Sequence, residues 1–176
     1  KSNAVVSDVK ITGTKAGAGT VANLIKASGN ISKVIIQKSN LENATKSGID
    51  FRNVSNSKID KVGIKEIKNT SNAVNGILLS NSNNNTLTNI TISNISASSN
   101  FSSSSGIYLS TSSSNTFTHI TISNISSSSN SSSGIRFKSG NNTLSNASIS
   151  YSKHYGISVE NGTANNTLRN VLVYKN

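Results

Sequence analysis

Six carboxylates are the side chains of this sequence that could carry acid–base chemistry or bind a hard cation. They are Asp8, Glu42, Asp50, Asp60, Glu66 and Glu160. Two carboxylates act as general acid and base, or share a calcium ion, only when the fold brings them close together. In the register of the internal repeat described below, no two of the six share a column on adjacent coils. Asp50 with Arg52 and Asp60 is the only grouping that could form a site, and surface salt-bridging is the alternative interpretation.

Other catalytic or metal-binding groups are sparse in the sequence. The chain has no Cys and no Met, which excludes thiolate and thioether ligands, and it has two His residues, His119 and His154. We expect His119 in an outward column and His154 in the segment 151–155, so their positions do not imply a shared metal ion. No nucleophile-elbow or phosphate-loop motif occurs. The sequence therefore predicts no metal and no cofactor.

The elements that must position these side chains follow from an internal repeat. An apolar triad at positions i, i+3 and i+5 recurs along the chain, with first positions 25, 28, 28, 30, 27 and 24 residues apart. The triads are Val6/Val9/Ile11, Ile31/Val34/Ile36, Ile59/Val62/Ile64, Leu87/Ile90/Ile92, Phe117/Ile120/Ile122, Leu144/Ala147/Ile149 and Leu168/Val171/Val173. A repeat of this period is typical of a solenoid of stacked coils.

Each repeat is predicted to contain about three short strands with corners between them. The step from i+3 to i+5 places two side chains on one face of a strand, whereas the step from i to i+3 requires a corner. A second apolar unit precedes most triads, as in Gly-Ile-Leu-Leu at 76–79 and Gly-Ile-Tyr-Leu at 106–109. No helical period is sustained, and β-branched residues dominate the apolar set. These patterns predict an all-β fold in which equivalent strands stack on a common core.

An asparagine recurs immediately before four of the triads, at Asn85, Asn115, Asn142 and Asn166. Asn suits tight bends, and amides stacked coil on coil would form a ladder. Enrichment in Ser and Asn is also typical of disordered tracts, but disorder would not keep the triads in register. We therefore predict one β-solenoid domain over residues 1–176 with Ser/Asn-rich loop inserts, either as a whole or as a segment or subunit of a longer assembly.

The repeat resembles that of the right-handed parallel β-helices of the pectin-lyase-like superfamily. The resemblance rests on Asn-Asn-Thr-Leu-Thr-Asn-Ile-Thr-Ile-Ser at 84–93, followed by Gly-Ile-Tyr-Leu at 106–109, and it extends over nearly the whole chain. It implies a right-handed parallel β-helix of about seven coils. Members of the superfamily include polysaccharide lyases and hydrolases, phage tailspikes, adhesins, surface-layer modules and copper-delivery proteins, so the resemblance does not select an activity.

The charge of the chain is positive but unevenly distributed. The net charge is +11; residues 1–70 carry 12 Lys/Arg and 5 Asp/Glu, whereas residues 69–135 carry none of either. Because only three Arg are present and no aromatic residues interleave the lysines, the sequence does not predict specific nucleic-acid binding. No apolar run approaches the roughly 20 residues that a membrane-spanning helix needs. The lysines are interpreted as solvated residues on a β surface.

Asn-x-Ser/Thr sequons are frequent, and attached glycans would solubilise the uncharged surface. The expected acceptors are Asn100 and Asn130 in the long inserts, followed by Asn94, Asn124, Asn69 and Asn161. This pattern favours an extracellular or cell-surface location with covalently attached glycans.

The first and last triads, Val6/Val9/Ile11 and Leu168/Val171/Val173, are expected to form open ends, because neither terminus shows a capping helix. Open strand edges are templates for joining another chain. The expected partner is therefore another copy of the chain stacked head-to-tail in a homopolymer, or a neighbouring solenoid segment.

Three functional hypotheses follow from the sequence. The main hypothesis is a non-catalytic extracellular structural protein, a glycosylated β-solenoid that builds a surface layer, stalk or head-to-tail filament and is not an enzyme. The alternative is a carbohydrate-active or carbohydrate-binding β-helix with a groove at Asp50, Arg52, Asp60 and Tyr108. A second alternative is an ice-binding solenoid, based on Thr columns such as Thr86, Thr116, Thr143 and Thr167, although Lys58 and Arg169 interrupt the array.

Overall fold

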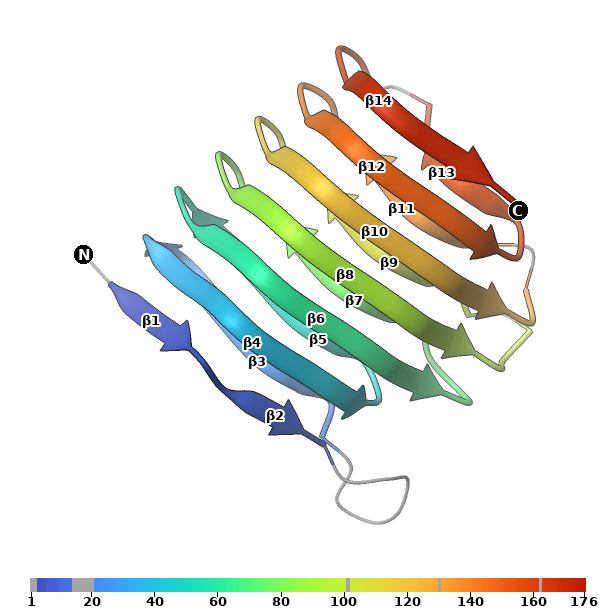
Figure 1. Ribbon diagram of the computed structural model, residues 1–176, viewed down its shortest axis with the longest axis horizontal. Coiled ribbons are helices and arrows are strands. Elements are labelled where there is room, and N and C mark those ends of the chain that lie inside the picture. Colours follow the sequence, from blue (N-terminus) through green and yellow to red (C-terminus); the bar gives the residue numbers. More distant parts are fainter. Residues whose placement is uncertain (1–2, 14–20, 101, 130, 162) are drawn as a thin grey trace.

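Every regular element in the described part of the chain is a β-strand (Figure 1). The computed structural model describes residues 3–13, 21–100, 102–129, 131–161 and 163–176. The strands are β1 (Ala4–Ser7), β2 (Lys10–Thr12), β3 (Asn23–Ser32), β4 (Val34–Ala44), β5 (Ser47–Ser55), β6 (Lys58–Asn69), β7 (Val74–Ser80), β8 (Thr86–Ala97), β9 (Ser104–Ser110), β10 (Thr116–Ser127), β11 (Ser132–Lys138), β12 (Thr143–Ser152), β13 (Tyr155–Val159) and β14 (Thr167–Tyr174).

Two parallel sheets alternate along the chain. Sheet A has the order β1-β4-β6-β8-β10-β12-β14, with β2 also paired to β4, and sheet B has the order β13-β11-β9-β7-β5-β3. The chain passes from one sheet to the other and back, so each turn adds one rung to both sheets (Figure 1). The all-β parallel solenoid predicted from the sequence is confirmed. It makes about six turns, where the sequence predicted about seven.

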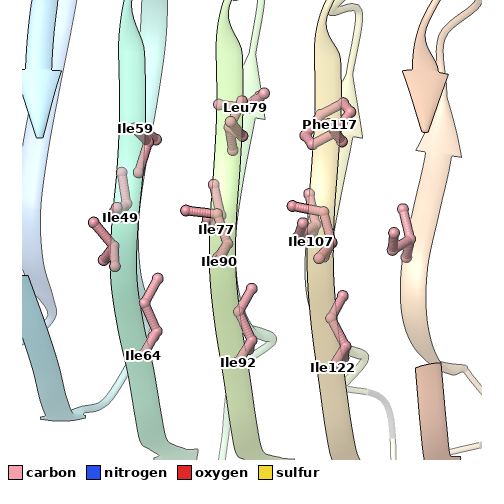
Figure 2. Close-up of a cluster of buried hydrophobic side chains, with 14 of the residues drawn as sticks. Ile49, Ile59, Ile64, Ile77, Leu79, Ile90, Ile92, Ile107, Phe117 and Ile122 are labelled. Atoms are coloured by element: carbon pink, nitrogen blue, oxygen red, sulfur yellow. The ribbon is translucent and has the colours of Figure 1, made fainter. Parts of the chain in front are cut away.

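Pairing between rungs is in register, which stacks like residues on one another. Ile92 pairs with Ile122, and Ile90 pairs with Ile120. All four are at most 1% exposed, so their predicted burial is confirmed, although they form two adjacent columns and not one. Figure 2 shows Ile64, Ile92 and Ile122 stacked from rung to rung in the core between the two sheets. Burying a column of this kind is favourable because no single strand could cover its own apolar face.

The second predicted triad, which began at Ile31, is wrong. Ile36 pairs with Ile59 and Leu41 pairs with Ile64, so Ile36 begins the core positions of this coil. Ile31 lies at the end of β3 in sheet B. The error arises because a buried serine, Ser39, occupies the middle position of the true triad and pairs with Val62, so the apolar spacing is complete only in the wrong register.

The glycine of each Gly-Ile unit is required by close packing. A Cβ added at Gly76 would lie 2.6 Å from the carbonyl oxygen of Gly106 and 2.7 Å from Cγ2 of Ile92. Both distances are shorter than real Cβ contacts allow, so a larger residue would push adjacent rungs apart. The recurring glycine therefore marks the point where the backbone of sheet B approaches the side chains of sheet A.

The predicted asparagine ladder is confirmed. Nδ2 of Asn85 donates to Oδ1 of Asn115 at 3.1 Å, Nδ2 of Asn115 donates to Oδ1 of Asn142 at 3.1 Å, and Nδ2 of Asn142 donates to Oδ1 of Asn166 at 3.2 Å. The amides also bond the backbone, as Nδ2 of Asn115 does with the carbonyl oxygen of Ser82 at 3.0 Å. Buried polar groups that are satisfied in this way do not carry the cost of desolvation.

Corners of the solenoid use the left-handed backbone region. In one coil the residues Asn84, Asn89 and Asn94 have φ values of 57°, 55° and 57°. Asn adopts this conformation more readily than other non-glycine residues. The residue that turns each ladder corner is therefore the one before the ladder asparagine, such as Asn84 before Asn85, and the ladder asparagine itself points inward.

We predict that Asn115→Ala lowers the free energy of unfolding by at least about 1–3 kcal/mol, because it leaves buried partners such as the carbonyl oxygen of Ser82 unpaired. Thr116→Ala is the matched control, since Thr116 is the next residue and is exposed, and it should change stability by no more than about 0.5 kcal/mol. Urea denaturation of both variants measures the difference. Equal effects of the two substitutions would contradict a stabilising ladder.

Candidate functional site

Charged, polar and aromatic side chains gather on the outward face of sheet B. Ile49 and Phe51 are buried in the core, so strand alternation turns Asp50 and Arg52 outward. In-register pairing extends these two positions along the sheet as two columns, which we call the sheet B face. The columns are Lys26, Asp50, Leu78, Tyr108, Arg136 and Ser158, and Ser28, Arg52, Ser80, Ser110, Lys138 and Glu160.

Asp50 and Arg52 form an ion pair at one end of the sheet B face. Nε of Arg52 lies 2.9 Å from Oδ1 of Asp50. The Asp50 side chain is 1% exposed and the Arg52 side chain is 43% exposed, so the guanidinium covers the carboxylate and presents itself to solvent. Oδ2 of Asp50 has no hydrogen-bond partner in the described part of the chain. This geometry makes Asp50 a residue that positions Arg52, and it argues against contact of Asp50 with a ligand.

Tyr108, Arg136 and Glu160 form a connected group farther along the same face. The Arg136 guanidinium carbon lies 5.3 Å from the centre of the Tyr108 ring, within the range of a cation–π interaction. Nε of Arg136 donates to Oε1 of Glu160 at 2.6 Å, and Nζ of Lys138 lies 3.5 Å from Oε2 of Glu160. Arg136 is thus held from both sides, by the Tyr108 ring on one neighbouring rung and by the Glu160 carboxylate on the other.

The Glu160 carboxyl is held in its ionised form. Burial raises its pKa, but the hydrogen bond from Arg136 and the charges of Arg136 and Lys138 together outweigh burial, so the pKa of Glu160 lies below its ordinary value. An ionised Glu160 keeps Arg136 paired near neutral pH.

Asp60 does not belong to the sheet B face, so the predicted grouping of Asp60 with Asp50, Arg52 and Tyr108 is wrong. Asp60 lies in β6 of sheet A, where Oδ1 accepts a hydrogen bond from Nδ2 of Asn89 at 3.1 Å. The sequence places Asp60 only ten positions after Asp50, but the chain turns a corner between β5 and β6 and enters the other sheet.

The spacing of carboxylates on the sheet B face does not fit hydrolysis by an acid–base pair. Asp50 and Glu160 are four rungs apart, which is about 19 Å at roughly 4.8 Å per rung. Glycoside hydrolysis by two carboxylates requires a separation of about 5–9.5 Å. The described residues also contain no group of three His, Cys, Asp or Glu side chains that could hold a metal ion. The face presents guanidinium, ammonium and aromatic groups, which bind anions and rings.

The two histidines lie on separate elements. His119 is at the corner within β10 in sheet A, with a φ of 54°. Nδ1 of His154 lies 2.7 Å from Oγ of Ser132. Neither is part of the sheet B face.

The predicted glycosylation acceptors differ in their surroundings. Asn100 and Asn161 are exposed in turns. Nδ2 of Asn69 donates to the carbonyl oxygen of Thr45 at 2.6 Å, and Nδ2 of Asn94 donates to Oε1 of Glu66 at 2.7 Å. Nδ2 of Asn124 donates to Oδ1 of Asn94 at 3.2 Å. Asn130 lies outside the described residues. Glycosylation stays a prediction, and among the described acceptors Asn100 and Asn161 are the ones that lie exposed in turns.

The residues predicted to form open ends lie in the outermost rungs of sheet A (Figure 1). Val9, Leu168 and Val173 are exposed. Val6, Ile11 and Val171 are partly buried against the core. Assembly with another copy or with a neighbouring solenoid segment stays a prediction.

The predicted threonine columns are real neighbours in sheet A. Thr116 pairs with Thr86 and with Thr143, and Thr143 pairs with Thr167. Lys58 occupies the same column next to Thr86, as the sequence indicated. A flat array is therefore limited to a few rungs, and threonine is equally suited to any outward strand position.

The sequence did not single out Arg136, Lys138 and Glu160 as site residues. Arg136 stands in the same position of its Gly-Ile unit as Tyr108 and Asp50, so this column was visible in the sequence. Glu160 lies two residues beyond the last such position, and its pairing with Arg136 becomes apparent only when β13 is stacked on β11.

The chain belongs to the right-handed β-helix family. The family model described as "Right handed beta helix region" matches residues 21–176. This match confirms the predicted right-handed parallel β-helix. No curated protein matches the chain in sequence.

Solved structures with the same fold include carbohydrate-active enzymes. The periplasmic alginate epimerase AlgG is similar over 97% of this chain and 39% of its own, with a TM-score of 0.67 and 14% identity. The Agl-KA catalytic domain is similar over 97% of this chain and 40% of its own, with a TM-score of 0.53 and 12% identity. At these identities the similarity shows the fold, and the chain spans less than half the length of either protein.

These comparisons overturn the main functional hypothesis drawn from the sequence. A non-catalytic structural solenoid, and with it the expectation that the chain is not an enzyme, is contradicted because the solved relatives in fold are an epimerase and a catalytic domain. The sequence-based preference rested on the open ends, the sequons and the scarcity of paired acids. Open ends and sequons do not exclude an enzyme, and scarce acids do not bear on chemistry that uses other groups. No membrane-spanning helix is found among the described residues.

We predict that Glu160→Gln destabilises the protein at pH 7 and that the difference disappears in acid. A carboxyl whose folded-state pKa is lowered contributes stability above its unfolded pKa of about 4.3, and loses that contribution as the pH falls through the folded value. Urea denaturation of both proteins at pH 7 and near pH 3 measures this. A difference that stays constant or grows on acidification would contradict the ion pair.

Proposed function

We propose that this chain is part of a carbohydrate-active β-helix protein whose sheet B face binds an acidic polysaccharide. The observation that carries the proposal is the arrangement of Arg52, Leu78, Tyr108 and Arg136 on successive rungs of one outward face. The fold relatives, an alginate epimerase and the Agl-KA catalytic domain, support a carbohydrate ligand by analogy.

The layout of the face suits an extended, negatively charged chain of rings. Arg52 and Arg136 lie at either end of an uncharged middle, about 14 Å apart at roughly 4.8 Å per rung. Tyr108 is partly exposed and offers an aromatic surface in that middle, whereas the neighbouring Leu78 is buried. Guanidinium groups bind carboxylates with two parallel hydrogen bonds, and aromatic rings stack on apolar surfaces of ligands. A polymer of acidic sugars would place its carboxylates at the ends and its ring faces over the middle.

The charge balance of the face favours an anion. Lys26, Arg52, Arg136 and Lys138 outnumber Asp50 and Glu160 on the two columns. Both acids are already engaged, Asp50 by Arg52 and Glu160 by Arg136 and Lys138. An anionic ligand therefore meets a surface with an excess of positive charge, and its binding weakens with added salt because these cations are partly solvated.

Proton transfer is the chemistry that this face can supply to a bound uronate. A guanidinium that neutralises the carboxylate makes the adjacent carbon-bound proton easier to remove, which is electrostatic stabilisation of developing charge. The Tyr108 hydroxyl is the group beside Arg136 that can accept or donate a proton. Hydrolysis by a carboxylate pair does not fit, because Asp50 and Glu160 are too far apart.

We also propose that the protein acts outside the cytoplasm. Support comes from the periplasmic location named for the alginate epimerase of the same fold and from the exposed sequons at Asn100 and Asn161.

We predict that Tyr108→Ala and Arg136→Gln each weaken binding to polygalacturonate or alginate by roughly tenfold or more, about 1.4 kcal/mol. Isothermal titration calorimetry against these polymers and against a neutral glucan measures the effect. Incubation with the same polymers, followed by assay for new reducing ends, unsaturated uronides and epimerised residues, detects turnover.

Arg169→Gln is the matched control, because Arg169 is an exposed arginine of β14 in sheet A. It should leave affinity and any turnover unchanged. Binding that is equally strong for the neutral glucan, or equally weakened by Arg169→Gln, would overturn the assignment of the sheet B face.

A further inference from the structure

A second polar surface lies on sheet A, on different strands from the sheet B face. A cavity of about 550 Å³ opens on the outward side of the sheet, lined by residues of β2, β4, β6 and β8, which lie next to one another (Figure 1). Small-molecule sites usually have volumes of about 300–1,000 Å³. The side chains of Leu41, Val62 and Ile64 point into the core, so these residues supply backbone to the floor. The walls are formed by outward polar side chains.

Gly63 creates the hollow. Every neighbouring rung has a side chain at this outward position, including Asn40 in β4, Thr91 in β8 and Thr121 in β10. The backbone of Gly63 is not in the left-handed region, because Gly29 is the only described glycine with a positive φ. A Cβ at Gly63 would approach only the movable Oδ1 of Asn40, at 2.7 Å. The fold therefore does not require glycine here, and its effect is to leave space.

Among the described residues, the charges around the cavity leave one lysine without an ion pair, although its charge also helps to lower the pKa of the neighbouring Asp60. Nζ of Lys10 lies 2.9 Å from Oε1 of Glu42, and Nζ of Lys65 lies 3.1 Å from Oε2. The hydrogen bonds from Lys10, Lys65 and Thr12 hold the pKa of Glu42 at about 2, so this carboxylate is ionised and already paired. Lys61 is exposed at the corner and has no ion-pair partner among the described residues. Three lysines against one glutamate give the cavity a net positive charge.

The hollow at Gly63 and the lysines around it occur at one place on a surface that otherwise repeats from rung to rung. In β10 the positions equivalent to Gly63 and Lys65 are Thr121 and Ser123, and the corner position of Lys61 is taken by His119. The hollow and its cations are therefore local departures from the repeat, and neither follows from stacking the coils. The rest of the wall offers neutral hydrogen-bonding groups, including those of Asn40, Thr91 and Ser93.

We propose that this cavity binds a small acidic sugar, a hexose unit that carries one carboxylate or phosphate group. Lys61 and Lys65 bind the anionic group, and Asn40, Thr91 and Ser93 bind the ring hydroxyls. Glu42 accepts a hydrogen bond from a hydroxyl while it stays paired with the lysines. The site is independent of the proposed function, because it uses another sheet, other residues and a ligand of a different size.

The test uses the full chain and four probes: glucuronate, glucose 6-phosphate, glucose and inorganic phosphate. Chemical-shift titration by NMR should show saturable binding of the two acidic sugars, with shifts at Gly63, Thr91 and Ser93. Glucose and inorganic phosphate should bind at least tenfold more weakly, because glucose lacks the anionic group and inorganic phosphate lacks the sugar ring with its hydroxyls. The difference between glucuronate and glucose 6-phosphate identifies which anionic group the site prefers.

Two substitutions locate the binding. Gly63→Thr installs the side chain found on the next rungs, and it should abolish saturable binding while the melting temperature stays within a few degrees of the parent. Lys61→Gln should weaken both acidic sugars about tenfold or more without filling the cavity. Lys58→Gln, an exposed lysine of the same strand outside the cavity, and Thr121→Gly, the reverse change on another rung, should leave binding unchanged.

The proposal would be overturned by no saturation by either acidic sugar at millimolar concentration, by equal binding of glucose or of inorganic phosphate, or by normal binding in both Gly63→Thr and Lys61→Gln. Tyr108→Ala should have no effect on these small probes. If Tyr108→Ala alone abolished their binding, the ligand would occupy the sheet B face, and the cavity assignment would be wrong while the proposed function would stand.

Discussion

In-register parallel stacking is the constraint on which the rest of this structure depends. Each inward residue lies directly over its equivalent about 4.8 Å away, so neighbouring residues of a column must pack against one another. Ile92, Ile122 and Ile149 satisfy this by apolar contact. The buried asparagines satisfy it differently, because an amide is both donor and acceptor and can bond the next amide in the column. Ser39 has no like neighbour, since it pairs with Val62, and its hydroxyl donates instead to the carbonyl oxygen of Gln37 at 2.7 Å.

Outward columns are free of this constraint, and variation there carries information. An outward residue needs only to be compatible with a strand, so Ser and Thr can fill most positions without specific contacts. Departures from that background then stand out as candidates for recognition. Tyr108 and Arg136 stand in an outward column of sheet B in which Ser158 is the one Ser or Thr among the six paired residues, and Gly63 interrupts a run of Asn and Thr in a column of sheet A. Both candidate sites are therefore found by the same criterion, a departure from the Ser and Thr background.

The division between inward and outward positions also explains which features of the structure could be predicted from the sequence. The triads and Gly-Ile units are inward features, and their spacing predicted the solenoid, the buried isoleucines and the asparagine ladder. The predicted register of the coil at Ile36 was wrong because Ser39 takes the place of an apolar residue in the true triad. The predicted grouping of Asp60 with Asp50 was also wrong. Asp60 is near Asp50 along the chain but lies in the other sheet. Contacts such as Arg136 with Glu160 depend on the length of each loop, and loop length decides which residues meet across rungs.

The charge distribution connects these observations. Residues 69–135 contain no Lys, Arg, Asp or Glu, so the charged groups of the sheet B face can occur only on rungs before and after that stretch. Arg52 and Arg136 are the arginines that border it, and Tyr108 lies between them on a rung that has no charge. In a solenoid the separation of two such groups is set by the number of rungs, because the core columns fix each rung on the next. The uncharged stretch is therefore, in three dimensions, a rigid spacer that holds two cationic positions at a constant distance along one face.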